Sequence, residues 1–177
     1  MRRTNDVFLI YRGEEEFVVN GYTDASFQTN TDDSQSQLGF VFTINSGAVS
    51  WRSSKQAIVT DSTTEAEYTA ASESMKEGVW MRMFLIELGV LPNASSPLNL
   101  HCDNNGAIAL VKEPRNHKKN KHVLQKFHLI QEFVRQDEIK MCKIHTDLNI
   151  ADPLTKALPQ PKHEAHLRSM GTRYLRD

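Results

Sequence analysis

Four acidic residues stand at positions where strands are expected to end or helices to begin. Asp24 and Asp103 each follow a short apolar run typical of a strand, while Glu67 and Asp152 lie near the starts of two helical patterns. In an open α/β sheet the loops at the strand ends converge, which makes them the usual place for a functional site. Carboxylates are the ligands that Mg²⁺ prefers. The pattern is therefore compatible with a cation site, and each acid taken singly also fits a surface charge or a helix cap.

Two glutamates at the start of the long helical pattern, Glu65 and Glu67, are candidates for the acid that faces the site. Steps of four residues from Glu67 lead through apolar residues to Met83, whereas the same steps from Glu65 lead through Thr69 to further glutamates. Ser62 and Glu65 match a capping box, but the same template fits the pair two residues later, so capping does not decide between them. The apolar stripe does decide, because a residue above that stripe faces the sheet. We therefore expect Glu67 to face the site.

The elements that must position these acids are predicted as three strands followed by alternating helices and strands. Strands are expected at residues 17–23, 38–44, 48–51, 98–102 and 139–144, and helices at 63–88, 104–111, 121–136, 151–158 and 162–170. Short turns between the first three strands favour an antiparallel meander, and the helical connections favour parallel addition of the last two. We expect an α/β fold with a five-stranded mixed sheet and helices on both faces.

The bulk composition is that of an ordinary globular domain. The 177 residues are 39% hydrophobic and 24% charged, with a formal net charge of −1. No apolar run approaches the roughly 20 residues that span a bilayer. The two cysteines, Cys102 and Cys142, are too few for a disulfide framework, which favours a reducing, intracellular setting.

Positive charge is concentrated in one segment, from Lys112 to Lys126. This segment holds six basic residues and one acidic residue, a local charge of 6 − 1 = +5. Such a segment can contact nucleic-acid phosphates, and it can equally be a solvated loop and helix face. Its three central lysines, Lys118, Lys119 and Lys121, are the candidates for phosphate contacts.

Several short motifs follow one another in a fixed order: Thr23–Ser26, Val49–Gln56, Ser62–Tyr68, Cys102–Leu110 and Ala151–Lys156, joined by Lys121–Val123 and the pair Phe127-His128. Together they resemble the ribonuclease H domain of copia-type retrotransposon Pol polyproteins. The similarity covers roughly residues 21–158. It implies a ribonuclease H-like fold and an endoribonuclease that cuts the RNA strand of an RNA–DNA hybrid with two Mg²⁺ ions, for which Mn²⁺ could substitute. The expected division of the chain is an N-terminal segment at 1–16, the domain at 17–158 and a C-terminal helix and tail at 159–177.

The resemblance also assigns roles to individual residues. The catalytic, metal-binding carboxylates it implies are Asp24, Glu67, Asp103 and Asp152. The contacts to the hybrid that it implies are made by Ser62, Thr63, Thr64 and Asn105. Asn105 stands where the family usually carries a glutamine. Cellular and retroviral relatives place a mobile histidine in the loop before the last acid; that loop is shorter here, and His145 is the candidate for this role.

The partners implied are the RNA–DNA hybrid and an upstream reverse transcriptase domain of the same polyprotein, with no membrane and no disulfide partner. The expected location is the cytoplasm, within virus-like particles, with the nucleus as the other compartment.

Three other interpretations of the sequence compete with a nuclease of this kind. A binding or structural module that keeps the fold without catalysis is disfavoured because all four acids are present. An integrase or transposase core would end its acidic set with a glutamate on a late helix, whereas the last acid here is Asp152. A zinc protein would use His163 and His166, but their spacing is not that of a metalloprotease and no cysteine pair accompanies them, so we expect both on a polar helix face.

Overall fold

A computed structural model describes residues 6–11, 13, 17–28, 34–91, 96–112 and 130–175 of the chain. Its main sheet contains five strands in the spatial order β4-β3-β2-β5-β6. Their bounds are Val19–Ser26 for β2, Gln37–Ile44 for β3, Gly47–Lys55 for β4, Leu98–Cys102 for β5 and Ile139–Lys143 for β6. The strands β2, β3 and β4 pair antiparallel, while β5 runs parallel to β2 and β6 runs parallel to β5. This confirms the predicted mixed sheet of three antiparallel strands and two parallel ones.

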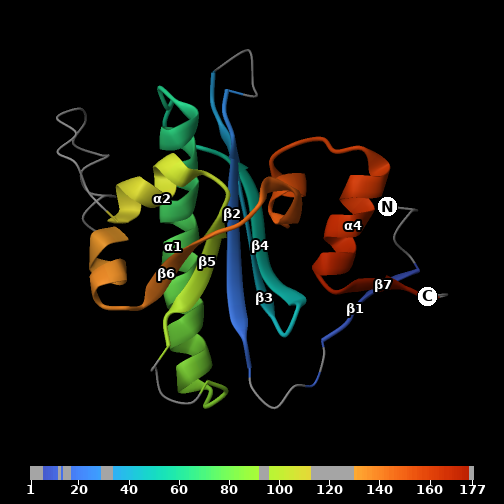
Figure 1. The fold of residues 1–177 in the computed structure, drawn as a ribbon. Helices are drawn as coiled ribbons and strands as arrows, with labels where there is room; N and C mark the ends of the chain where they lie inside the picture. The colour runs from blue at the N-terminus through green and yellow to red at the C-terminus, as the bar shows by residue number, and fades with distance from the viewer. Residues whose placement is uncertain are drawn as a thin grey trace.

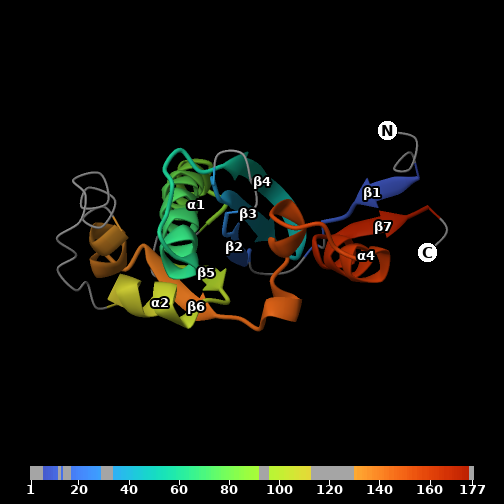
Figure 2. The same cartoon turned by 90° about the horizontal axis from the view of Figure 1, so that it is seen from above.

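Helical segments cover the sheet on both sides, as expected. The long helix α1 (Thr63–Glu87) and α2 (Asn105–Lys112) lie together on one side, and α4 (Gln160–Ser169) lies on the other (Figures 1 and 2). The larger core cluster joins α1 to the inner strands, with Phe42, Met75 and Leu100 fully buried. A smaller cluster around Val41 and Ile150 packs beneath α4.

The helix α1 begins at a cap that the sequence predicts. The Ser62 hydroxyl accepts a hydrogen bond from the Glu65 backbone N–H at 3.2 Å, while the Glu65 carboxylate accepts from the Asp61 N–H at 2.9 Å. The predicted apolar stripe holds at Met75 and fails at Met83, whose side chain is 56% exposed. Each step of four residues turns about 40° past a full revolution, because an α-helix has 3.6 residues per turn. After four such steps the stripe has therefore left the sheet.

The chain ends form a second, two-stranded sheet that the sequence analysis does not predict. In it β1 (Val7–Leu9) pairs antiparallel with β7 (Thr172–Tyr174). This small sheet lies beside α4, away from α1 (Figure 2).

Two predicted helices differ in the structure. The helix expected at 151–158 is only a short 3-10 helix, η2 (Asp152–Leu154), because the residues after it, Thr155 and Lys156, are held by Asp24 on the sheet. Of the helix expected at 121–136, residues 130–135 are helical and residues 121–129 lie outside the described part of the chain. None of the described helices has the length and apolar character needed to cross a membrane.

Candidate active site

Asp24 lies within the central strand β2 rather than at its end, because the strand continues to Ser26. Its side chain is fully buried. The Thr155 hydroxyl donates a hydrogen bond to one carboxylate oxygen, and the Lys156 ammonium lies 3.4 Å from the other. Burial, together with the nearby Asp103 and Asp152 charges, outweighs these two contacts and raises the pKa of Asp24 from 3.8 to about 6.

A glycine opposite Asp24 allows the C-terminal turn to reach it. Gly39 in β3 is the register partner of Asp24. A Cβ atom at this position would lie 2.8 Å from the Leu154 Cβ and 2.9 Å from the Thr155 Cγ2. The absence of a side chain at Gly39 therefore allows residues 154 and 155 to pack directly on the sheet, where Thr155 meets Asp24.

Glu67 reaches the same region from the second turn of α1. Only 6% of the residue is exposed, in keeping with its predicted orientation towards the sheet. Burial, followed by the charges of Asp24 and Asp103, raises the pKa of Glu67 from 4.5 to about 9, although the Ala25 backbone N–H donates to its carboxylate. The Lys156 charge also lowers this pKa, but by less than burial and the two neighbouring acids raise it.

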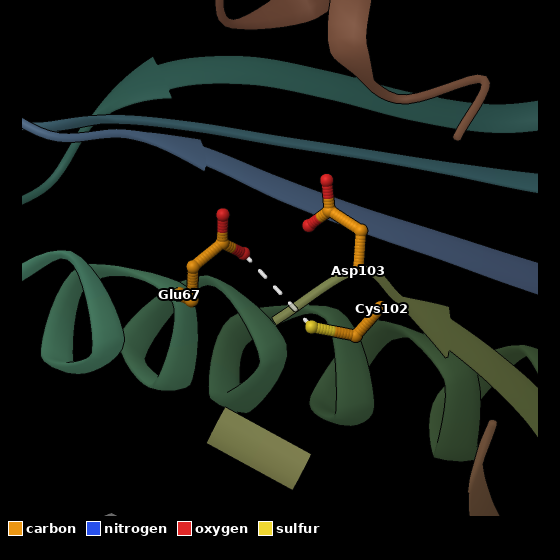
Figure 3. Close-up of side chains that lie close together, drawn as sticks. All are labelled: Glu67, Cys102 and Asp103. Carbon is orange, nitrogen blue, oxygen red and sulfur yellow. Dashed lines mark hydrogen bonds between the residues drawn. The ribbon is translucent and has the colours of Figure 1, made fainter. Parts of the chain in front are cut away.

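Asp103 follows the last residue of β5 and completes an acidic cluster with Glu67. Ligand atoms of Glu67, Cys102 and Asp103 lie within 4.8 Å of one another (Figure 3). The Cys102 Sγ lies 4.0 Å from a Glu67 oxygen. Burial and the Glu67 charge raise the pKa of Cys102 to about 12, so this thiol remains protonated and adds no charge to the cluster.

Asp152 enters from η2 and is connected to Asp24 through lysine. Lys156 Nζ lies 2.7 Å from Asp152 Oδ1, and Lys162 Nζ lies 3.3 Å from Asp152 Oδ2. Burial works to raise the pKa of Asp152, but hydrogen bonds and charges from the two lysines outweigh it and hold the pKa below 3.8. The four predicted acids thus fall into a pair, Glu67 and Asp103, and a lysine-bridged pair, Asp24 and Asp152, coupled through Asp24.

The residues expected to contact the hybrid lie at two adjacent helix starts. Ser62 and Thr63 are exposed at the start of α1, and Thr64 is partly buried. Asn105 is exposed at the first position of α2. A Cβ at Gly106 would lie 2.8 Å from the Thr64 hydroxyl oxygen, so the two helix starts touch at this glycine.

The remaining candidates lie outside the acidic cluster or outside the described residues. Lys118, Lys119 and Lys121 belong to the segment that the structure does not describe. The His145 side chain is 73% exposed, and its Nδ1 accepts a hydrogen bond from the Asp147 N–H at 3.3 Å.

His163 is exposed as expected, but His166 is buried, so the expectation that both share a polar face is wrong. His166 lies on the inner side of α4, in line with the packing of neighbouring Leu167 and Met170 into the smaller core cluster.

Three residues that organise the site were not singled out from the sequence. Thr155 and Lys156 bind Asp24, and Asn149 is fully buried, donating to the Thr23 carbonyl at 2.9 Å while accepting from the Ala151 N–H at 3.3 Å. The contact of Lys156 with Asp152 could have been predicted from the sequence, because the two residues are four positions apart. The contacts with β2 could not, because they join residues more than 120 positions apart.

Comparisons with known proteins agree with this architecture. No protein-family model matches the chain. The chain is 40% identical over 164 residues to the retrovirus-related Pol polyprotein from transposon TNT 1-94 of Nicotiana tabacum, covering 93% of this chain and 12% of the relative. It is 33% identical over 153 residues to that from transposon RE2 of Arabidopsis thaliana, covering 86% of this chain and 10% of the relative. The chain therefore spans about a tenth of the length of these relatives.

Two solved structures show the same fold at low identity. The structure of LC11-RNase H1 in complex with an RNA/DNA hybrid matches with a TM-score of 0.56 at 18% identity, covering 77% of this chain and 92% of that one. The foamy viral protease-reverse transcriptase in complex with an RNA/DNA hybrid matches with a TM-score of 0.52 at 19% identity, covering 79% of this chain and 20% of that one. The chain thus matches a segment of the retrovirus-related Pol polyproteins of plant copia-type transposons, as the motif resemblance predicted, and has the ribonuclease H fold.

Proposed function

We propose that this chain is a metal-dependent endoribonuclease that hydrolyses the RNA strand of RNA–DNA hybrids during retrotransposon reverse transcription. The observation that carries the proposal is the convergence of Asp24, Glu67 and Asp103 from β2, α1 and the end of β5. Their mutual repulsion and burial raise the pKa values of Asp24 and Glu67. Such an arrangement is costly unless a cation compensates the charge.

The donor atoms of this cluster fit a hard divalent cation. Asp24, Glu67, Asp103 and Asp152 supply only carboxylate oxygens, and the protonated Cys102 thiol adds no soft ligand. These four residues would hold Mg²⁺. When bound, a pair of such ions makes a water nucleophilic and stabilises the leaving 3′-oxygen of the cleaved RNA.

The surroundings of the cluster suit a nucleic-acid backbone. Exposed hydroxyls of Ser62 and Thr63 stand at the start of α1, where the unpaired N–H groups and the helix dipole favour a phosphate. The amide of Asn105 stands beside them and can contact the RNA strand. The ammonium groups of Lys118, Lys119 and Lys121 would contact phosphates of the DNA strand, which adds affinity without sequence preference. His145 is exposed in the loop before Asp152 and is the candidate for the mobile histidine that related enzymes place there.

The partner in the parent polyprotein would be a reverse transcriptase domain. The foamy viral protease-reverse transcriptase, which shares this fold, was solved in complex with an RNA/DNA hybrid, and the matched region is only 20% of its chain. A polymerase domain upstream would hold the same hybrid and present its RNA strand to this site.

A cleavage assay tests the proposed function. The purified chain is incubated with a labelled RNA–DNA hybrid in Mg²⁺ or in EDTA, beside duplex DNA and duplex RNA. We expect cleavage of the RNA strand of the hybrid in Mg²⁺ alone, and a loss of at least about a hundredfold in Asp103→Asn. Asp137→Asn is the matched control, because Asp137 is an exposed acid in the turn before β6, away from the four acids.

Other results of this cleavage assay would point to a different function for the chain. Cleavage in EDTA, or full activity of Asp103→Asn, would contradict metal catalysis by this cluster. Hybrid binding without cleavage would indicate an inactive binding module, and cleavage of duplex DNA would indicate an integrase-like enzyme.

A further inference from the structure

The Lys156 ammonium lies between two of the carboxylates. It is 2.7 Å from Asp152 Oδ1 and 3.4 Å from Asp24 Oδ1, so one positive charge is shared by two buried acids from distant parts of the chain. Both acid side chains are at most 2% exposed, whereas the Lys156 side chain is 37% exposed. The lysine therefore reaches the acids from the solvent side and has a path back to solvent.

Other lysines near the site do not share this position. Lys143 donates to the backbone carbonyl of Asp103 rather than to its carboxylate. Lys162 contacts the second oxygen of Asp152 and also Asp147, at 3.3 and 3.1 Å, and the structure gives it no contact with Asp24. Among the described lysines, Lys156 is the one that bridges Asp24 and Asp152.

The local sequence fixes this placement. Lys156 follows Asp152 by four residues, and its backbone N–H donates to the Asp152 carbonyl at 3.1 Å. The preceding residue, Thr155, donates its hydroxyl to Asp24. Neighbouring residues thus hold the two oxygens of Asp24, one through a hydroxyl and one through an ammonium.

We propose that Lys156 is an internal counter-ion that holds Asp24 and Asp152 together without metal and competes with the divalent cation for their oxygens. The inference rests on the proposed function, because it takes these acids as metal ligands. Lys156 is then a positioning residue that sets how much metal the site requires. A cation near the two acids weakens binding of a second cation by coulombic repulsion, and removing it strengthens that binding.

Metal binding by lysine variants tests the proposal without reference to activity. Mn²⁺ serves as the probe, because the electron paramagnetic resonance signal of the free ion reports how much is bound. We compare the full chain with Lys156→Met, which keeps most of the side-chain length without charge, with Lys156→Gln, and with Lys156→Arg, which keeps the charge. Lys162→Met is the matched control, because of the four acids Lys162 contacts Asp152 and has no contact with Asp24.

The expected result has two parts. Lys156→Met and Lys156→Gln should bind Mn²⁺ more tightly, on the order of tenfold, as for one charge interaction at a partly buried site. Their melting temperature in EDTA should fall, because Asp24 and Asp152 then lack the cation between them. Lys156→Arg should remain close to the parent chain, and Lys162→Met should change Mn²⁺ affinity less than Lys156→Met does. A lysine with only a structural role would lower stability with or without metal and would not tighten Mn²⁺ binding.

The two proposals fail in different ways. If the parent chain binds Mn²⁺ and cleaves the hybrid but the neutral Lys156 variants bind Mn²⁺ no more tightly, the counter-ion proposal alone is overturned. If parent and variants bind no Mn²⁺ and the parent does not cleave, both are overturned. Circular dichroism confirms that each variant is folded, and a neutral variant that folds only when Mn²⁺ is present supports the counter-ion role.

Discussion

The protonation of Glu67 links the acidic cluster to the stability of the whole chain. Its pKa is about 9 in the folded chain and 4.5 when unperturbed, so folding favours the protonated carboxyl. A raised pKa gives stability that is complete below the unfolded pKa and is lost as the pH rises through the folded pKa. Asp24 acts in the same direction between 3.8 and about 6. We therefore expect the melting temperature in EDTA to fall between pH 5 and pH 9.

The variant Glu67→Gln isolates the contribution of this residue. An amide does not titrate, so the fall between pH 6 and pH 9 should be smaller in Glu67→Gln than in the parent chain. Mg²⁺ should restore stability at pH 8 in the parent, because a bound cation favours the ionised carboxylates. Parallel melting curves across the pH range for parent and variant would show that Glu67 ionises as an ordinary surface acid.

Asn149 makes a second residue-scale prediction, independent of the acids. Its amide satisfies the Thr23 carbonyl and the Ala151 N–H in the interior. Asn149→Ala should lower the free energy of unfolding by about 1 to 3 kcal/mol, because a buried group loses its partner. Urea denaturation measures this change. Asn104→Ala is the comparison. It removes the side-chain oxygen that accepts from the Ala107 N–H at the start of α2, a partly buried contact, and should lower the free energy of unfolding by less.

At the scale of the residue, the sequence predicted which acids form the site better than it predicted the contacts that those acids make. The orientation of Glu67 followed from the apolar stripe over its first two turns, since helix periodicity is local. The contacts of Thr155 and Lys156 with Asp24 could not follow from periodicity, because they depend on how the C-terminal turn packs on β3. Gly39, which permits that packing, looks like any glycine in a strand until the turn is placed over it.

The contact between β3 and the turn at η2 makes Gly39 sensitive to substitution. In Gly39→Ala the new methyl group would meet Leu154 and Thr155 at under 3 Å, so the turn must shift away from the sheet. We expect a loss of about 1 to 3 kcal/mol in the free energy of unfolding and a weaker metal site, because Thr155 and Lys156 move with the turn. Gly13→Ala is the control, since a Cβ there meets nothing within 4 Å. Equal stability of the two variants would contradict this packing.

At the scale of the element, strands and long helices were predicted within a few residues. The strand β5 begins and ends where its alternating pattern does, and α1 begins at its Ser62 cap. The short helix η2 was overestimated, because the residues from Ala151 to Leu158 are individually compatible with a helix, whereas the contacts of Thr155 and Lys156 with Asp24 depend on tertiary packing. An apolar stripe that is extended along a long helix in steps of four residues leaves the buried face, as at Met83, because each step adds about 40° of rotation.

At the scale of the whole molecule, the antiparallel and parallel pairing of the strands was predictable, whereas the place of β5 beside β2 and the joining of the chain ends were not. Antiparallel meanders and parallel crossovers follow from connection lengths, so the mixed sheet could be inferred. The strands β1 and β7 have three residues each and lie more than 160 residues apart, and neither has a pattern long enough to identify. Only their proximity in the folded chain lets them pair.

This small sheet should contribute to stability without contributing to the acidic cluster. Residues 7–11 connect to the rest of the chain through the pairing with β7, the Ile10 N–H bond to the Gly171 carbonyl at 2.9 Å and the Tyr11 hydroxyl bond to the Ala48 carbonyl at 2.8 Å. Each such bond contributes roughly 0.5 to 1.5 kcal/mol, and one kcal/mol shifts the melting temperature of a chain of this size by about 2 to 4 °C.

Deleting residues 1–11 should therefore lower the melting temperature by several degrees, measured by circular dichroism. Cleavage of the hybrid at 25 °C in Mg²⁺ should persist, because Asp24, Glu67, Asp103 and Asp152 all belong to segments outside the small sheet. Tyr11→Phe, which removes a single hydrogen bond, is the milder comparison and should shift the melting temperature by about 1 to 6 °C. A deleted chain that remains folded at 25 °C but no longer cleaves would show that the chain ends support the carboxylates after all.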